Sequence, residues 1–229
     1  MVRGAAAGSS SAKAPKVTAP RLPPVSLQEL RDDPAPDFQR GERYDGLRYG
    51  RAEADGLDLS ATDFAECEFA GVSFNETQLR GATFRDCVLT EMYAPVFLAA
   101  RTSLRDVRIG NPRWGSAELY ESSWQSVRID GGKLDYVNLR GAKLADLQIS
   151  DCIINELDLA SCTATRVALK NCTIGTLDLG GARLKDFDLR GTDFRVLSGL
   201  DSLSGLVIDD YQLTLLAPLL ASHLGVVVA

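Results

Sequence analysis

The sequence predicts an all-β rod, built from short extended segments that are joined by tight corners and repeat every five residues. Three observations lead to this prediction. Every fifth residue is apolar over a long stretch, the residues two places before them are mostly small or apolar, and a helical spacing replaces this pattern only near the C-terminus. An amphipathic helix repeats about every 3.6 residues and a half-buried strand about every 2, so neither element explains a period of five.

The period is clearest at positions whose numbers end in 4 or 9. From Leu59 to Phe194, 28 consecutive positions of this register carry no polar residue. Because 24% of the chain is charged, chance does not produce such a run. Nearly all the charge falls on the three positions of each five that belong to neither apolar register. We therefore expect two inward residues in every five, with glycine favoured at the corners because it tolerates a positive φ.

Several stretches resemble the signature of the pentapeptide-repeat family, among them TDFAECEF, YVNLRGAKL and DFDLRGTDF. The resemblance covers roughly residues 57–195. It implies a right-handed quadrilateral β-helix with four pentapeptides in each coil, hence about seven coils from 28 repeats. At the usual spacing of parallel strands, the rod would be ~34 Å long.

The rest of the chain divides around this rod. Residues 1–22 are rich in Ala, Ser and Pro and are expected to form a disordered tail. Residues 23–56 are predicted to form an N-terminal cap and the first coil, residues 57–196 the β-helix and residues 197–229 a helical cap. Within the N-terminal cap, SLQELRDD could form one or two helical turns, whereas Tyr44, Leu47 and Tyr49 already keep the inward register.

The C-terminal segment has the spacing of a helix, with Asp209 as a candidate N-cap and Gly225 as a candidate stop. Pro218 is expected to kink the helix or divide it in two. Its apolar residues either cover the last coil or form a dimer contact, since the resemblance implies pairing through the C-terminal end, as in gyrase-binding relatives. The candidate cap or dimer contacts are Leu213, Leu216, Leu220 and Leu224.

The cysteines and tryptophans are expected to be core residues. All five cysteines have numbers ending in 2 or 7, so their thiols should point inward and pack as small apolar groups: Cys67, Cys87, Cys152, Cys162 and Cys172. Trp114 lies 20 residues after Ala94, which should leave room for its ring on the neighbouring coil.

No constellation of catalytic residues is found in the sequence. His223 is the sole histidine and has no thiol or serine partner in a recognisable motif. A rod filled with Leu and Phe offers no desolvated pocket for a pair of carboxylates. We therefore expect no enzyme activity, no cofactor and no metal site.

The remaining candidate for function is the outer surface. The four walls carry net charges between −2 and 0 over residues 58–196, so none resembles a phosphate stripe, and direct binding of nucleic acid is not expected. One wall carries outward apolar residues that could contact a protein partner, unless residues 22–38 fold back over them. These candidate contacts are Tyr93, Pro95, Val96, Tyr136, Ile153 and Val196.

The sequence thus predicts a non-catalytic rod that acts as a protein-interaction module. The alternative, implied by the resemblance, is a DNA-mimicking binder of DNA gyrase or topoisomerase that protects the enzyme from poisons. The chain has no apolar run long enough to cross a bilayer and no secretory signal, so we expect a cytoplasmic protein.

Overall fold

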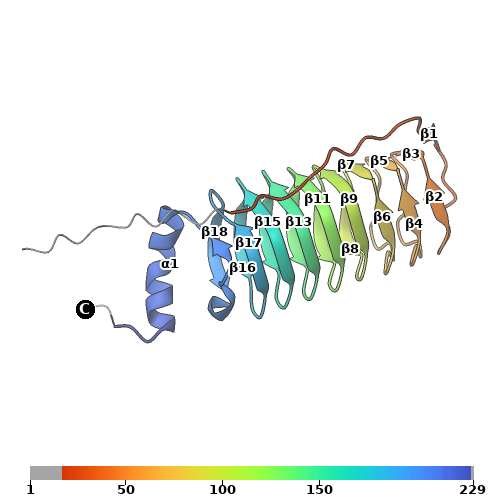
Figure 1. Ribbon diagram of the computed structural model, residues 1–229. Coiled ribbons are helices and arrows are strands. Elements are labelled where there is room, and N and C mark those ends of the chain that lie inside the picture. Colours follow the sequence, from red (N-terminus) through yellow and green to blue (C-terminus); the bar gives the residue numbers. More distant parts are fainter. Residues whose placement is uncertain (1–16, 228–229) are drawn as a thin grey trace, which may run out of the picture.

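The computed structural model describes residues 17–227, which form a parallel β-solenoid with one C-terminal helix (Figure 1). Each strand of the rod pairs with the strand about 20 residues further along the chain, as in the pairing of Trp114 with Leu134. The predicted all-β solenoid is therefore confirmed, with its four short sides per coil grouped into two sheets.

The larger sheet has 13 strands and the smaller has six. The larger one contains β1 (Arg31–Asp32), β2 (Arg43–Asp45), β3 (Leu47–Gly50), β4 (Asp63–Ala65), β5 (Glu68–Ala70), β6 (Thr83–Arg85), β7 (Val88–Thr90), β9 (Ser103–Gly110), β11 (Ser123–Asp130), β13 (Lys143–Ser150), β15 (Thr163–Lys170), β17 (Arg183–Asp188) and β19 (Leu206–Val207). The smaller one contains β8 (Tyr93–Leu98), β10 (Arg113–Glu118), β12 (Lys133–Asn138), β14 (Ile153–Asp158), β16 (Thr173–Asp178) and β18 (Asp193–Ser198).

The solenoid has about nine turns, so the prediction of about seven coils was too low. The added turns lie at the two ends, outside the 28 regular repeats. At the N-terminal end, β1 pairs with β3, and at the C-terminal end β19 pairs with β17. Both end strands are two residues long, which is too short to show the period of five that identifies the central coils.

The interior of the rod is the core that the register predicts. Aromatic rings stack from coil to coil in its N-terminal half, where the ring centroids of Phe64 and Phe84 are 5.0 Å apart. All five cysteines are free and buried. Trp114 pairs with Ala94 on the neighbouring coil and is 3% exposed, so the small residue makes room for the large ring as expected.

Corner residues have a left-handed backbone, and many of them are not glycine. Ala61 is one example, with φ of 60° at an exposed corner. An L-residue in this conformation costs roughly 1–2 kcal/mol relative to the right-handed form. Gly81, one coil further on, has φ of 69° and no atom within 4 Å of the place that a Cβ would take.

These two corners give a matched test of backbone strain. We expect Ala61→Gly to raise the free energy of unfolding by about 0.5–1 kcal/mol, because the relief of strain exceeds the added entropy of the unfolded chain. Gly81→Ala should lower it by a similar amount. Urea denaturation of both variants measures the two changes, and changes of the same sign would exclude left-handed strain as their cause.

Separate elements close the two ends of the solenoid. At the N-terminal end, Phe38 is 6% exposed and packs against Tyr44 and Tyr49, with its ring centroid 5.0 Å from that of Tyr49. The expected helical turn in SLQELRDD is absent: residues 26–30 form no helix and Arg31–Asp32 form β1. Arg31 and Asp32, at the end of this stretch, pair with Leu47 and Arg48 of β3 instead.

At the C-terminal end, a short 3-10 helix, η1 (Leu200–Ser202), precedes α1 (Asp210–His223). Asp209 caps α1 and Gly225 follows its end with φ of 71°, as predicted. Pro218 does not divide the helix. Because proline has no N–H, Pro218 cannot donate a hydrogen bond to the carbonyl of Thr214, four residues earlier. Thr214 is exposed, so water can bind to this carbonyl instead.

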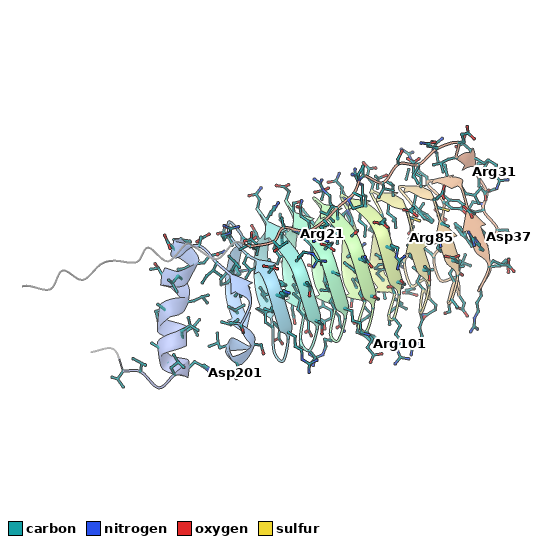
Figure 2. All side chains as sticks on the ribbon, viewed as in Figure 1. Arg21, Arg31, Asp37, Arg85, Arg101 and Asp201 are labelled. Carbon is teal, nitrogen blue, oxygen red and sulfur yellow. The ribbon has the colours of Figure 1, made fainter. Side chains whose placement is uncertain are left out.

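Residues 17–30 lie along the outside of the rod and are called the strap below. They run from the C-terminal coils back to β1 (Figure 1), and Figure 2 shows Arg21 midway along the rod and Arg31 at its far end. The expected loose tail of residues 1–22 falls mainly outside the described residues. Its described part, residues 17–22, is instead fastened by two hydrogen bonds, from the backbone nitrogens of Thr18 and Arg21.

Candidate protein-contact surfaces

The six candidate contact residues all belong to the six-stranded sheet, whose outer face is called the six-stranded wall below. They come from four of its strands, β8, β12, β14 and β18. Tyr93, Ile153 and Val196 are 50–52% exposed. Pro95, Val96 and Tyr136 are half-buried. Every one of these side chains therefore has at least part of its surface accessible to a partner.

The strap does not cover this wall. Thr18, Arg21 and Arg31 bind to Asp186, Asp146 and Gly46, which lie in or beside strands of the 13-stranded sheet. These attachment points are about half a coil away from the candidate residues. The hypothesis that residues 22–38 fold back over the apolar wall is therefore wrong: the described chain follows a corner on the other side.

The apolar residues of the wall are spread along it. Tyr93 and Ile153 stand in the same column, three coils or ~14 Å apart, with Arg113 and Lys133 between them. Tyr136 has Ser116 and Glu156 as its neighbours in the next column. The wall thus offers separate apolar contacts framed by charged groups.

Polar residues on and beside this wall bind one another from coil to coil. Asn138 Nδ2 donates to Glu118 Oε2 over 2.7 Å, and the Asn155 amide donates to Asp135 one coil below. Arg140 pairs with Asp158 at 3.0 Å. Because these groups are satisfied within the rod, they form a flat and rigid frame around the exposed apolar side chains.

Of the four leucines predicted to form cap or dimer contacts, two are at least partly buried in the C-terminal cap and two are exposed. Leu216 is 2% exposed and Leu220 is partly buried against the core, so these two cover the last coil. Leu213 and Leu224 are 50% and 74% exposed and do not. Two acidic residues of the cap also have partners: Asp201 Oδ1 lies 2.9 Å from Nε2 of His223, and Asp209 accepts a bond from the backbone N–H of Gly191.

Sequence reasoning missed a second apolar stripe on α1. Tyr211, Leu215 and Leu219 follow at intervals of four residues and are 67%, 49% and 48% exposed. Val226 and Val227 are exposed just beyond the helix. The spacing of four residues is visible in the sequence, but covering the last coil requires only one apolar face. The helix α1 has apolar residues on a second side as well.

Two further features of the described residues concern metal-ligating side chains and cavities. Within residues 17–227, no group of three or more His, Cys, Asp or Glu side chains could hold a metal ion. A cavity of about 20 Å³ lies inside the rod, and apolar side chains and Thr102 line it. No helix in the described part of the chain is long and apolar enough to cross a membrane.

The fold defines a class of protein, a parallel β-solenoid with flat walls and a helical cap at one end. The particular repeat is identified by a family comparison: residues 55–90 match the model of pentapeptide repeats in eight copies. The chain thus contains pentapeptide repeats, as the sequence signature indicates.

Similar solved structures include QnrB1, a plasmid-mediated fluoroquinolone resistance protein, with 21% identity over 82% of this chain and 94% of that one, at a TM-score of 0.38. HetL, a pentapeptide-repeat protein of heterocyst differentiation regulation from the cyanobacterium Nostoc, has 17% identity over 75% and 91%, at a TM-score of 0.28. A search of curated proteins found no match.

Proposed function

We propose that this protein is a non-catalytic protein-interaction module of the cytoplasm, which pairs with a second copy through α1 and binds another protein on the six-stranded wall. The observation that carries the proposal is the uncovered apolar stripe of Tyr211, Leu215 and Leu219 at the end of the rod. An exposed apolar patch of this kind marks a contact site in most soluble proteins.

The exposed stripe of α1 is best suited to contact a second copy of the same chain. Leu216 and Leu220 already cover the last coil, so the neighbouring stripe of Tyr211, Leu215 and Leu219 is not needed to close the solenoid. A helix that is apolar on more than one side is normally buried on more than one side. A two-fold axis at this end would bring two identical stripes together, which is the commonest symmetry of homo-oligomers.

Pairing through α1 gives a direct prediction. We expect the wild-type protein to sediment as a dimer and the double variant Leu215→Lys, Leu219→Lys to sediment as a monomer. The melting temperature of the rod should change little, because both side chains are about half exposed already. Sedimentation velocity and thermal unfolding measure the two effects.

The matched control places the same two charges on the wall. Tyr93→Lys with Ile153→Lys changes two side chains of equal exposure, 52% each, on the other surface. This control should remain a dimer and lose binding to a wall partner. If the wild-type protein stayed monomeric at about 1 mM, pairing through α1 would be excluded, and the wall would remain as the proposed contact surface.

The alternative function is binding of DNA gyrase or topoisomerase by mimicry of DNA. It is supported by the rod shape and by the net charge of −6. A supercoiling assay with purified gyrase and a fluoroquinolone separates the two functions. Inhibition of supercoiling, or protection from the drug, at micromolar rod would identify the alternative; the absence of both leaves the general interaction module.

A further inference from the structure

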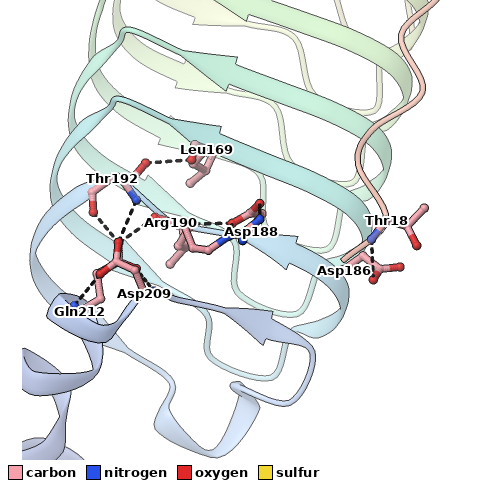
Figure 3. A network of polar contacts seen from close by, with 10 residues as sticks. Thr18, Leu169, Asp186, Asp188, Arg190, Thr192, Asp209 and Gln212 are labelled. Carbon is pink, nitrogen blue, oxygen red and sulfur yellow. Dashed lines mark hydrogen bonds and ion pairs between the residues drawn. The ribbon is translucent and has the colours of Figure 1, made fainter. Parts of the chain in front are cut away.

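The strap lies on the rod as an extended peptide lies on a receptor. It is held through its backbone: Thr18 N–H donates to Asp186 Oδ1 over 3.2 Å and Arg21 N–H donates to Asp146 Oδ1 over 2.8 Å. Directly after the strap, Arg31 N–H donates to the carbonyl oxygen of Gly46 over 2.9 Å. Figure 3 shows the Thr18 contact at the C-terminal coils.

The spacing of these acceptors matches an extended chain. Asp186, Asp146 and Gly46 occupy the same corner of different coils, and the two aspartates are two coils or ~10 Å apart. Thr18 and Arg21 are three residues apart, which an extended chain spans in ~10 Å. The corner therefore presents carboxylates at intervals that suit the backbone N–H groups of a straight peptide.

Asp146 is the best-built part of this site. It is 4% exposed, and its two carboxylate oxygens accept bonds from Nε and Nη2 of Arg166, both over 2.6 Å. The bonds from Arg166, followed by that from the Arg21 backbone, hold the pKa of Asp146 below its usual value. The carboxylate is thus fixed in place by the rod before it receives the strap.

The strap itself is suited to being displaced by another peptide. Pro20, Pro23 and Pro24 lack a backbone N–H, so this stretch cannot join the sheet as an ordinary strand and favours an extended polyproline conformation. No residue from 17 to 30 is fully buried. A segment with few buried contacts opens at a small fraction of the global unfolding free energy.

We propose that this corner is a binding site for extended, proline-containing peptides, and that the strap is its ligand within the same chain. The site recognises two backbone N–H groups three residues apart, at Asp186 and Asp146. A partner protein with such a segment binds by displacing the strap. This site is separate from the six-stranded wall and from α1.

The test begins with the full-length chain, which folds with its strap in place. A site-specific protease sequence inserted after Glu29, an exposed residue, allows the strap to be cut from the folded rod. A fluorescent peptide of residues 17–30 is then titrated into cut and uncut protein. A tethered strap has an effective concentration in the millimolar range, so we expect saturable binding to the cut protein and at least about tenfold weaker binding to the uncut protein.

A modified peptide and a protein variant test the chemistry of the site. A peptide methylated on the Arg21 backbone nitrogen keeps its charge and loses the donor, and it should bind about tenfold more weakly; methylation at exposed Ser26 is the control. In the protein, Asp186→Asn should weaken binding several-fold, whereas Asp151→Asn, at another corner, should not. Equal binding to cut and uncut protein, no binding to cut protein at about 1 mM peptide, or no effect of Arg21 methylation would overturn the proposal.

Discussion

Replacing Leu144 by aspartate is expected to destabilise the rod by about 3–5 kcal/mol, because it places an uncompensated charge in a dry core. Leu144 is 2% exposed and stacks between Trp124 and Ala164 of the neighbouring coils. None of these neighbours offers an ionic partner for the new carboxylate. Urea unfolding of Leu144→Asp and wild type, followed by circular dichroism, measures the loss.

The reactivity of Cys162 shows whether the disturbance caused by Leu144→Asp reaches the neighbouring coil. Cys162 lies two residues before Ala164, the pairing partner of Leu144, and it is fully buried. Burial raises the pKa of its thiol to about 12, so the reactive thiolate is scarce in the native protein at neutral pH. We expect wild-type Cys162 to resist alkylation until the chain unfolds, and Leu144→Asp to label much faster.

The same substitution one residue earlier is the matched control. Lys143 is exposed, so Lys143→Asp should change the unfolding free energy by less than about 0.5 kcal/mol and leave Cys162 protected. If Leu144→Asp melted with the wild type, or if native Cys162 were alkylated rapidly, the inward register of this part of the rod would be contradicted.

The regular interior was predictable because it repeats. Leu144 and Cys162 are assigned to the core by position alone, since every coil imposes the same inward direction on the same register. The ends were less predictable. Arg31–Asp32 and Leu206–Val207 join the solenoid through pairing with β3 and β17, which no period in their own sequence signals.

The candidate surfaces were predictable only in part. The register correctly placed Tyr93 and Ile153 on the outside, but it could not show which wall the N-terminal segment follows. The strap is located by bonds from its backbone to corner carboxylates, and backbone groups are the same in every sequence. The second stripe of α1 was missed because the fold of one copy does not require it.

The C-terminal cap contains the second substitution with a large expected effect, at Gln212. Its side chain is 3% exposed and donates from Nε2 to the carbonyl oxygens of Leu189 and Thr192, over 2.7 and 2.8 Å. Its Oε1 accepts the backbone N–H of Asp209 over 3.0 Å, and this bond completes the capping box of α1 (Figure 3). One amide thus joins the helix to the open end of the solenoid.

Gln212→Leu should lower the free energy of unfolding by about 2–5 kcal/mol, because it leaves the buried carbonyl of Thr192 and the N–H of Asp209 without partners. It also removes one of the two donors to the carbonyl of Leu189, which keeps the N–H of Thr192. Hydrogen exchange should show faster exchange in α1 and in β18 before the central coils are affected. The control is Gln125→Leu at an exposed ladder position, for which we expect a change within about 0.5 kcal/mol. Equal losses in the two variants would show that the cap does not depend on this amide.

Gln212→Glu separates hydrogen bonding from packing, because it keeps the shape and replaces the amide donor by a titrating oxygen. An ionised carboxylate facing two carbonyl oxygens is unfavourable, so the pKa of the introduced group should be raised in the folded protein above its ordinary value of about 4.3. A raised folded pKa contributes stability below the unfolded pKa, and this contribution is lost as the pH rises through the folded pKa. The deficit of this variant relative to wild type should therefore be small near about pH 4 and large near about pH 8, whereas the deficit of Gln212→Leu should not change with pH. Unfolding curves of both variants across this range measure the difference, and a pH-independent deficit for Gln212→Glu would mean that this side chain does not donate to the carbonyl groups of the last coil.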